Sequence, residues 1–379
     1  VWSGVQEVKW DINDENERVP KVKAVLDTEG VAVPVPTDFY YIGGTVDTGV
    51  VISDNESDKD KYRTYSSVPS GYSYENDIDG DETTVAYLLE GNQFVWVPVT
   101  GGIENARSDF GINKNGGANF ADYIDVFDAE YRDRTAIHNT GRSLTFDDVA
   151  DYESMKTSVN NYGGFYVARY EAGSSNDAQD GTVVSQANKK PWDKITQTNA
   201  KAKCEDMYSE SSSVKSLLMS SYTWDATLSF IQNKGDKKDV SNDSTSWGNY
   251  KNRRPTNNNT IEFSGYYANN GTWENIASFT GSAWATGTHA SIGTYENYLK
   301  LATGIAPSTK ANNIYDIAGN MFEWTTEVSK NGATNNRVLR GGGYNYNGSD
   351  RPASSRSGID SVTYTNMRIG FRPQLFIQM

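Results

Sequence analysis

The chain has 379 residues, of which 36% are hydrophobic and 12% aromatic, so it can bury a sizeable core and does not have the composition of a disordered protein. Its formal net charge of −14 disfavours binding to nucleic-acid phosphates and to anionic lipid surfaces. No run of 18 apolar residues is present, which argues against a membrane-spanning helix, and the single cysteine, Cys204, excludes intramolecular disulfides and cysteine-based zinc sites.

The first part of the chain is predicted to form short strands. Residues 1–30 are highly charged and weakly patterned, so we expect an N-terminal extension or attachment segment. Residues 31–54 alternate β-rich runs with Pro and Gly breaks, which is typical of short strands. Residues 53–85 are rich in Asp, Glu, Ser and Gly and are expected to form a surface loop. Phe94–Val99 is apolar almost throughout, which predicts a strand with both faces covered.

A helix is predicted to begin at Thr145, because Thr145 and Asp148 have the spacing of a capping box. Gly163 and Gly164 are expected to end this helix and to open a strand over Phe165–Tyr170. The apolar residues of the helix fall on one face: Phe146, Val149, Tyr152, Met155 and Val159.

Two more helices are predicted, one over Thr198–Tyr208 with Cys204 in its middle, and one that follows Ser221. Residues 234–313 are rich in Asn, Ser, Gly and Trp and show few regular patterns. We expect long loops with short strands there, which are uncommon in a compact domain and usually functional. Three tryptophans are expected to pin these loops: Trp247, Trp273 and Trp284.

Three motifs follow one another in the C-terminal third: Gly319–Trp324 (GNMFEW), Arg340–Tyr344 (RGGGY) and Ile369–Arg372 (IGFR). In this order they resemble the formylglycine-generating-enzyme superfamily. The resemblance covers roughly residues 90–379 and extends at most to residues 31–379. It implies an α+β, C-type-lectin-like fold that is irregular and loop-rich, with a small twisted antiparallel sheet and two or three helices. Residues 234–313 would then be a long loop-rich insertion.

The motif residues also have a physical role as scaffold. Gly341–Gly343 allow positive φ and close backbone packing. Arg340 and Arg372 stand among apolar residues, and a buried arginine needs a carboxylate or several carbonyl groups as partners. We therefore expect most of these residues to support the fold.

No catalytic residue is predicted. The oxidases of this superfamily use two cysteines near the R-G-G segment, and residues 343–348 contain none. The related iron-dependent sulfoxide synthases need a histidine cluster, whereas His138 and His289 are isolated and no G-x-S-x-G elbow occurs. An enzyme of unknown chemistry that uses two of the 49 acidic residues stays an alternative, although no pair can be chosen.

Members of the superfamily can bind calcium through oxygen ligands, and Asn320 and Glu323 match the region of one such site. Carboxylates, amides and carbonyls are the ligands that calcium prefers. The opposing interpretation is that Asn320 caps a turn and Glu323 pairs with an arginine.

The composition changes between Gly343 and Asn366. Of these 24 residues, 15 are Gly, Ser, Thr, Asn or Asp and three are Tyr, whereas Lys, Glu, Gln and Trp are absent. The segment resembles the variable region of proteins that diversity-generating retroelements mutate. Those proteins use the same scaffold, and adenine-directed mutation of their Asn codons yields Tyr, Ser, Asp, Gly or Thr but never Lys, Glu, Gln or Trp. Residues 343–367 are the expected variable region, and Met367 is expected to be fixed.

The resemblance implies a non-catalytic receptor or adhesin of a phage or bacterium, at an extracellular, cell-surface or virion location. The ligand would be a protein or glycan on a target surface, bound with small polar residues and tyrosines as in antibody paratopes, and multivalent display would strengthen weak contacts. The alternative is a fixed structural or carbohydrate-binding module. We expect one exposed ligand-binding face, formed by Tyr344, Asn345, Tyr346, Asn347, Ser349, Asp350, Ser354, Ser355, Ser357, Asp360, Tyr364 and Asn366. Arg351 and Arg356 are expected to anchor the segment or to join the contact.

Overall fold

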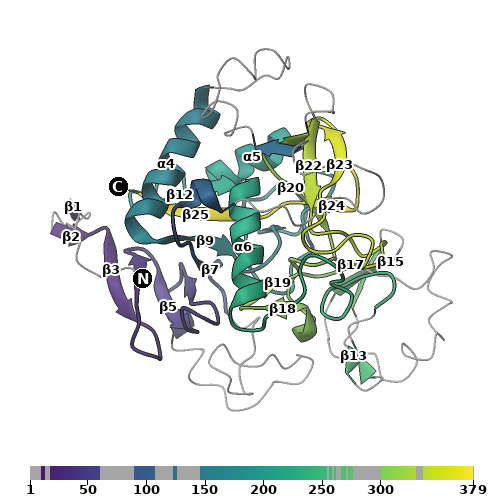
Figure 1. Cartoon of the computed structure of the whole chain (residues 1–379), viewed down its shortest axis with the longest axis horizontal. Helices are drawn as coiled ribbons and strands as arrows, with labels where there is room; N and C mark the ends of the chain where they lie inside the picture. The colour runs from purple at the N-terminus through teal and green to yellow at the C-terminus, as the bar shows by residue number, and fades with distance from the viewer. Residues whose placement is uncertain are drawn as a thin grey trace.

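The computed structural model describes residues 10–12, 18–59, 89–106, 123–125, 146–253, 256–257, 260–261, 266–269, 272–275, 300–329 and 336–378. These residues form a mixed α+β structure (Figure 1). Its largest element is a six-stranded sheet in which all neighbouring strands are antiparallel. In spatial order the strands are β12 (Val214–Leu218), β25 (Pro373–Ile377), β9 (Gly164–Ala168), β7 (Gln93–Pro98), β6 (Val51–Ser53) and β5 (Tyr40–Gly43).

Strand β7 matches the strand predicted over Phe94–Val99 and is covered on both faces. Phe94 and Trp96 point into one hydrophobic cluster, and Val95 and Val97 point into the other. This alternation follows from the period of two in a strand. Because both clusters are fully buried, the near-continuous apolar run is the expected sequence for this central position.

The three predicted helices are confirmed with small shifts at their ends: α4 (Phe146–Tyr162), α5 (Gln197–Asp206) and α6 (Ser221–Asn233). Gly163 follows α4 with a φ of 78°, which suits a glycine at a helix end. Thr145, the predicted cap, lies outside the described residues. Helix α6 begins with a capping box, in which the Ser220 side chain and the Thr223 side chain each bond the other residue's backbone N–H.

Helices α4 and α6 and the N-terminal strands pack on opposite faces of the large sheet. Tyr152 of α4 and Trp224 of α6 belong to the cluster on one face. On the other face, strand β4 (Ala32–Pro36) contributes Val33 and Val35 to the second cluster. Strand β3 (Val22–Leu26) pairs with β4 along its whole length, so the domain boundary expected after residue 30 falls inside a hairpin.

A second sheet has the order β23-β22-β20-β24 and holds the C-terminal motifs. It comprises β20 (Phe322–Trp324), β22 (Asn336–Arg340), β23 (Ser357–Ser361) and β24 (Ile369–Gly370). Its β20–β24 pair is parallel, whereas its β20–β22 and β22–β23 pairs are antiparallel. Strands β22, β23 and β24 lie on the side of the molecule opposite the N-terminal strands (Figure 1).

The remaining elements are short. They are β1 (Trp10–Ile12), β2 (Arg18–Pro20), η2 (Ile103–Asn105), β8 (Tyr123–Asp125), β10 (Gly173–Ser174), β11 (Val183–Val184), β13 (Thr256–Asn257), β14 (Thr260–Ile261), β15 (Tyr266–Asn269), β16 (Thr272–Asn275), β17 (Lys300–Leu301), η7 (Pro307–Thr309), β18 (Lys310–Ala311), β19 (Ile314–Tyr315) and β21 (Glu327–Ser329). Trp247 pins its loop as predicted, because it is buried and its Nε1 donates to the carbonyl of Asp239 (2.9 Å). The side chain of Trp273 and the whole of Trp284 lie outside the described residues. Among the described helices, none has the length and apolar character needed to cross a membrane.

Candidate functional site

The segment between β22 and β24, residues 341–368, leaves the second sheet through a glycine turn. Gly341 and Gly342 have φ values of 87° and 74°, as predicted for positions that favour glycine. A Cβ at Gly342 would lie 2.2 Å from the carbonyl oxygen of Arg351. The backbone at Gly342 and the backbone at Arg351 are therefore in direct contact. A Cβ at Gly343 would press on the Phe322 ring at 3.0 Å. The turn therefore fixes the direction in which the segment leaves the sheet.

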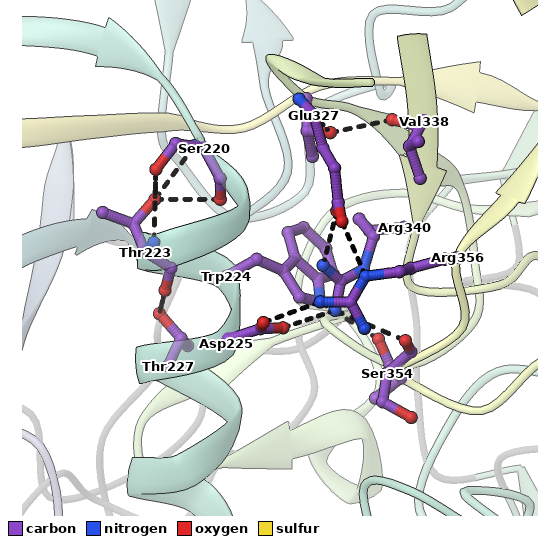
Figure 2. Close-up of polar contacts among 12 residues, drawn as sticks. Ser220, Thr223, Trp224, Asp225, Thr227, Glu327, Val338, Arg340, Ser354 and Arg356 are labelled. Atoms are coloured by element: carbon purple, nitrogen blue, oxygen red, sulfur yellow. Dashed lines mark hydrogen bonds and ion pairs between the residues drawn. The ribbon is translucent and has the colours of Figure 1, made fainter. Parts of the chain in front are cut away.

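Four fully buried charged residues hold the middle of this segment (Figure 2). Arg340 donates to Asp225 Oδ1 (2.8 Å) and to Glu327 Oε2 (2.9 Å). Arg356 donates to the other two oxygens, Asp225 Oδ2 (2.7 Å) and Glu327 Oε1 (2.6 Å). Each arginine thus bridges both carboxylates, and the net charge of the group is zero. We call these four residues the charge quartet.

The charge quartet joins parts of the chain that are distant in the sequence. Asp225 comes from α6, Glu327 from β21 and Arg340 from β22, whereas Arg356 belongs to the candidate segment itself. Burial, and then the charge of Arg356, lowers the pKa of Arg340. Burial would also lower the pKa of Arg356, but the charges of Asp225 and Glu327 outweigh it and raise that pKa. The mutual neutralisation is what allows four charges to be buried together.

Backbone hydrogen bonds reinforce this attachment. Arg340 also donates to the carbonyl of Ser354 (3.3 Å), and Trp224 Nε1 donates to the carbonyl of Ala353 (3.0 Å). The amide of Ala353 donates to Ser244 Oγ (3.0 Å). Residues 353–356 are therefore bound on several sides, and the expectation that Arg356 anchors the segment is confirmed.

The predicted binding residues divide into an exposed and a buried set. Tyr346 and Tyr364 are the most exposed, at 38% and 40% of their surface. Partly exposed side chains accompany them, namely Asn345, Asn347, Ser349, Asp350 and Asn366. The side chains of Ser357 and Asp360, in β23, lie outside what the structure describes.

For Tyr344, Ser354 and Ser355 the expectation of an exposed face is wrong, because they are buried, with exposures of 7%, 0% and 4%. Tyr344 follows the glycine turn directly and its amide donates to the carbonyl of Asn320 (2.9 Å). Ser354 and Ser355 precede Arg356 and are drawn inward with it. The composition of the segment cannot distinguish these positions from the exposed ones.

The two exposed tyrosines are held in different ways. The Tyr346 ring stands edge-on to Phe322 (5.4 Å between centroids), and the Arg351 guanidinium lies over the same ring (5.4 Å). The backbone carbonyl of Tyr346 accepts a hydrogen bond from the amide of Lys251 (2.8 Å). The Tyr364 hydroxyl accepts from Asn366 Nδ2 (2.8 Å). Both rings are thus oriented by neighbours while they present an open surface.

A matched pair of serine substitutions tests this division. Ser354→Tyr forces a large ring into a site without exposed surface, and overpacking of this kind costs roughly 1–3 kcal/mol. Ser349→Tyr adds the same ring at a partly exposed position, and we expect a change within about 0.5 kcal/mol. Urea unfolding of both variants measures the difference. Equal effects of the two substitutions would contradict the assignment of Ser354 to the scaffold.

A second buried network surrounds Glu323 and Asn320, the residues considered for calcium. Arg372 contacts both carboxylate oxygens of Glu323, with its Nη2 2.7 Å from Oε1 and its Nε 3.1 Å from Oε2. Asn320 has a φ of 53°, its Oδ1 accepts from the amide of Leu301 (2.9 Å), and its Nδ2 donates to Glu171 (2.6 Å). A calcium ion would have to displace a guanidinium from Glu323, so these residues do not fit a calcium site. They hold the loop turn and the last strand together instead.

Glu171 predicts a dependence of stability on pH. Burial, followed by the charges of Asp316 and Glu323, raises the pKa of its carboxyl well above the ordinary range. Between the unfolded and the folded pKa the folded state binds more protons, so the free energy of unfolding falls as the pH rises through this window. We expect Glu171→Gln to make this decline shallower, measured by urea unfolding from about pH 4.5 upwards. If the free energy of unfolding falls with pH equally steeply in the variant and the parent chain, Glu171 is not the cause of this pH dependence.

The sequence did not identify two acids of the charge quartet, Asp225 and Glu327. The sequence indicated that Arg340 and Arg372 need carboxylate partners, and these are Asp225, Glu327 and Glu323. Nothing in the sequence selects Asp225 and Glu327 from the 49 acidic residues, whereas the pairing of Glu323 with an arginine was one of the two interpretations of its motif and is confirmed. Cys204 is buried, and desolvation raises the pKa of its thiol. His138 and His289 lie outside the described residues.

Compared with known proteins, the chain matches no family model and no curated protein.

Proposed function

We propose that this chain is a non-catalytic binding protein with a C-type-lectin-like scaffold, whose C-terminal segment is diversified by a retroelement. The observation that carries the proposal is the alternation of two kinds of residue within residues 344–366. Exposed Tyr346 and Tyr364 lie in the same segment as Arg356, whose side chain is locked in the charge quartet. Such a segment can change its surface without changing its attachment.

The exposed residues have the chemistry of a contact surface. Tyrosine offers a large contact area for the loss of only two side-chain torsions, and asparagine, serine and aspartate adapt their hydrogen bonds to different ligands. Because the backbone is tied by the glycine turn and by residues 353–356, little further ordering is needed on binding. The ligand is a protein or glycan on a target surface, and display of several copies on a cell or virion would raise the avidity of weak single contacts.

Deep sequencing of the coding region in a natural population tests the proposal. We expect changes to concentrate at exposed positions, with Tyr344, Ser354, Ser355, Arg356 and Met367 constant. A reverse-transcriptase gene and a near-copy of the C-terminal coding segment should lie nearby. Among the predicted binding residues, the exposed or partly exposed positions are Asn345, Tyr346, Asn347, Ser349, Asp350, Tyr364 and Asn366.

Substitutions spread evenly over the chain would overturn diversification and leave a fixed lectin-like module. Loss of binding to a selected ligand in Tyr346→Ala and Tyr364→Ala, without loss of stability, would still support a binding role for this face. These two measurements separate the diversification from the binding.

A further inference from the structure

The exposed tyrosines stand beside cations that belong to the constant part of the chain. Lys194 is exposed, and its amide donates to the carbonyl of Asn366 (3.1 Å). Arg368 is half-buried, and its amide donates to Asn366 Oδ1 (3.0 Å). Asn366 in turn donates to the hydroxyl of Tyr364. Two residues with positive side chains therefore lie, through their backbone amides, beside the Tyr364 end of the segment.

Acidic residues near these two cations do not neutralise them. Asp193 is adjacent to Lys194, but it is buried and paired with Lys300, whose Nζ also donates to the carbonyl of Met367 (3.2 Å). Among the described residues, no ion pair joins Lys194 or Arg368 to an acid. In a chain with a net charge of −14, this places positive charge at the edge of the contact surface.

Two cations also lie at the Tyr346 end. Lys251 is exposed and holds the carbonyl of Tyr346 through its amide, and Arg351 lies over the ring. Two acids lie in this region as well: Asp350 accepts a hydrogen bond from Asn347 (3.0 Å), and the exposed Asp243 accepts from the amide of Thr245 (2.8 Å). Lys194, Lys251 and Arg368 all lie outside residues 344–366, so diversification would leave them unchanged.

We propose that these constant cations give the surface a fixed preference for carboxylate-rich protein partners, whatever residues occupy the exposed positions. The inference rests on the proposed binding function. Lysine and arginine at the edge of an interface steer oppositely charged partners and disfavour partners of the same charge. Tyrosine and arginine are also the residues enriched in protein–protein hot spots. Two tyrosines on separate stretches of the segment suit a broad protein contact better than a small-ligand pocket.

The test is a selection of random 12-residue peptides displayed on phage against the immobilised full chain. We expect Asp and Glu to be enriched over the input library, and binding of the selected peptides as synthetic ligands to weaken with added salt. Lys194→Glu with Arg368→Glu should weaken that binding about tenfold or more. Lys21→Glu with Lys23→Glu, among the N-terminal strands on the opposite side of the molecule, makes the same change of net charge and should leave binding within about twofold. Lys194→Glu alone, at an exposed position, guards against misfolding of the double variant.

The outcomes separate this inference from the proposed function. Selected peptides that require Tyr346 and Tyr364 but show no acidic enrichment would overturn the charge preference and leave the binding function standing. Acidic peptides whose binding survives Lys194→Glu with Arg368→Glu would also overturn it. If the chain binds sialylated or sulfated glycans on an array and selects no acidic peptides, the inference that the partner is a protein is wrong. Peptides that bind equally well to Tyr346→Ala and Tyr364→Ala would count against the proposed function itself.

Discussion

Replacing Arg356 by methionine is expected to lower the free energy of unfolding by about 3–5 kcal/mol. The substitution keeps much of the side-chain volume but removes one of the two arginines of the charge quartet that neutralise Asp225 and Glu327, both without exposed surface. An unpaired buried charge is costly because its lost hydration is no longer offset. Guanidinium unfolding monitored by tryptophan fluorescence measures the loss, since Trp224 donates to Ala353 beside the quartet.

Arg351→Met is the matched control, because it makes the same exchange five positions earlier at a half-buried arginine. We expect it to cost less than about 1 kcal/mol. The double variant Arg356→Met with Glu327→Met restores neutrality, so its cost should be clearly smaller than the sum of the two single costs. Additive costs, or a loss below about 1 kcal/mol for Arg356→Met, would show that the quartet does not act as a unit.

Arg372→Met is expected to destabilise the chain by a similar amount, roughly 3–5 kcal/mol. Arg372 neutralises Glu323 and also donates to the carbonyls of Ala168 (3.0 Å) and Tyr315 (2.9 Å), all of them buried. The substitution leaves a carboxylate and two carbonyl groups without their donor. Calorimetric or chemical unfolding measures the effect.

Glu323→Gln in the Arg372→Met background removes the stranded charge and should recover part of the lost stability. Arg368→Met provides the control four residues earlier, at a half-buried arginine without an ion pair among the described residues. If Arg368→Met costs as much as Arg372→Met, the loss reflects the general removal of arginines from this stretch and not the Glu323 network.

The sequence predicted the regular elements well where a local pattern determines them. The near-continuous apolar run Phe94–Val99 indicated a strand covered on both faces, and the apolar face of α4 indicated a helix. Parallel pairing of β20 with β24 could not be predicted, because the residues concerned are about fifty positions apart and no local signal fixes their register. The same holds for the quartet, since Asp225 meets Arg340 only through the tertiary fold.

The candidate site was predicted as a stretch of sequence but not as a surface. Small polar residues and tyrosines marked residues 344–366, yet Tyr344 and Ser354 point inward while Tyr346 and Ser349 reach the solvent or its edge. The direction of each side chain depends on the glycine turn and on the burial of Arg356 in the charge quartet. Neither can be read from the composition of the segment. Burial therefore narrows the predicted contact residues to those that can meet a ligand.

Strand β25 forms directly after the candidate segment and lies in the interior of the large sheet, between β12 and β9. Any reading-frame shift or stop codon introduced into the segment would delete this interior strand together with Arg372. Such a product would lose hydrogen bonds on both sides of β25 and would be cleared as unfolded protein. If the segment is diversified as proposed, folding selects among the variants, because only chains translated in frame through the segment contain β25 and Arg372.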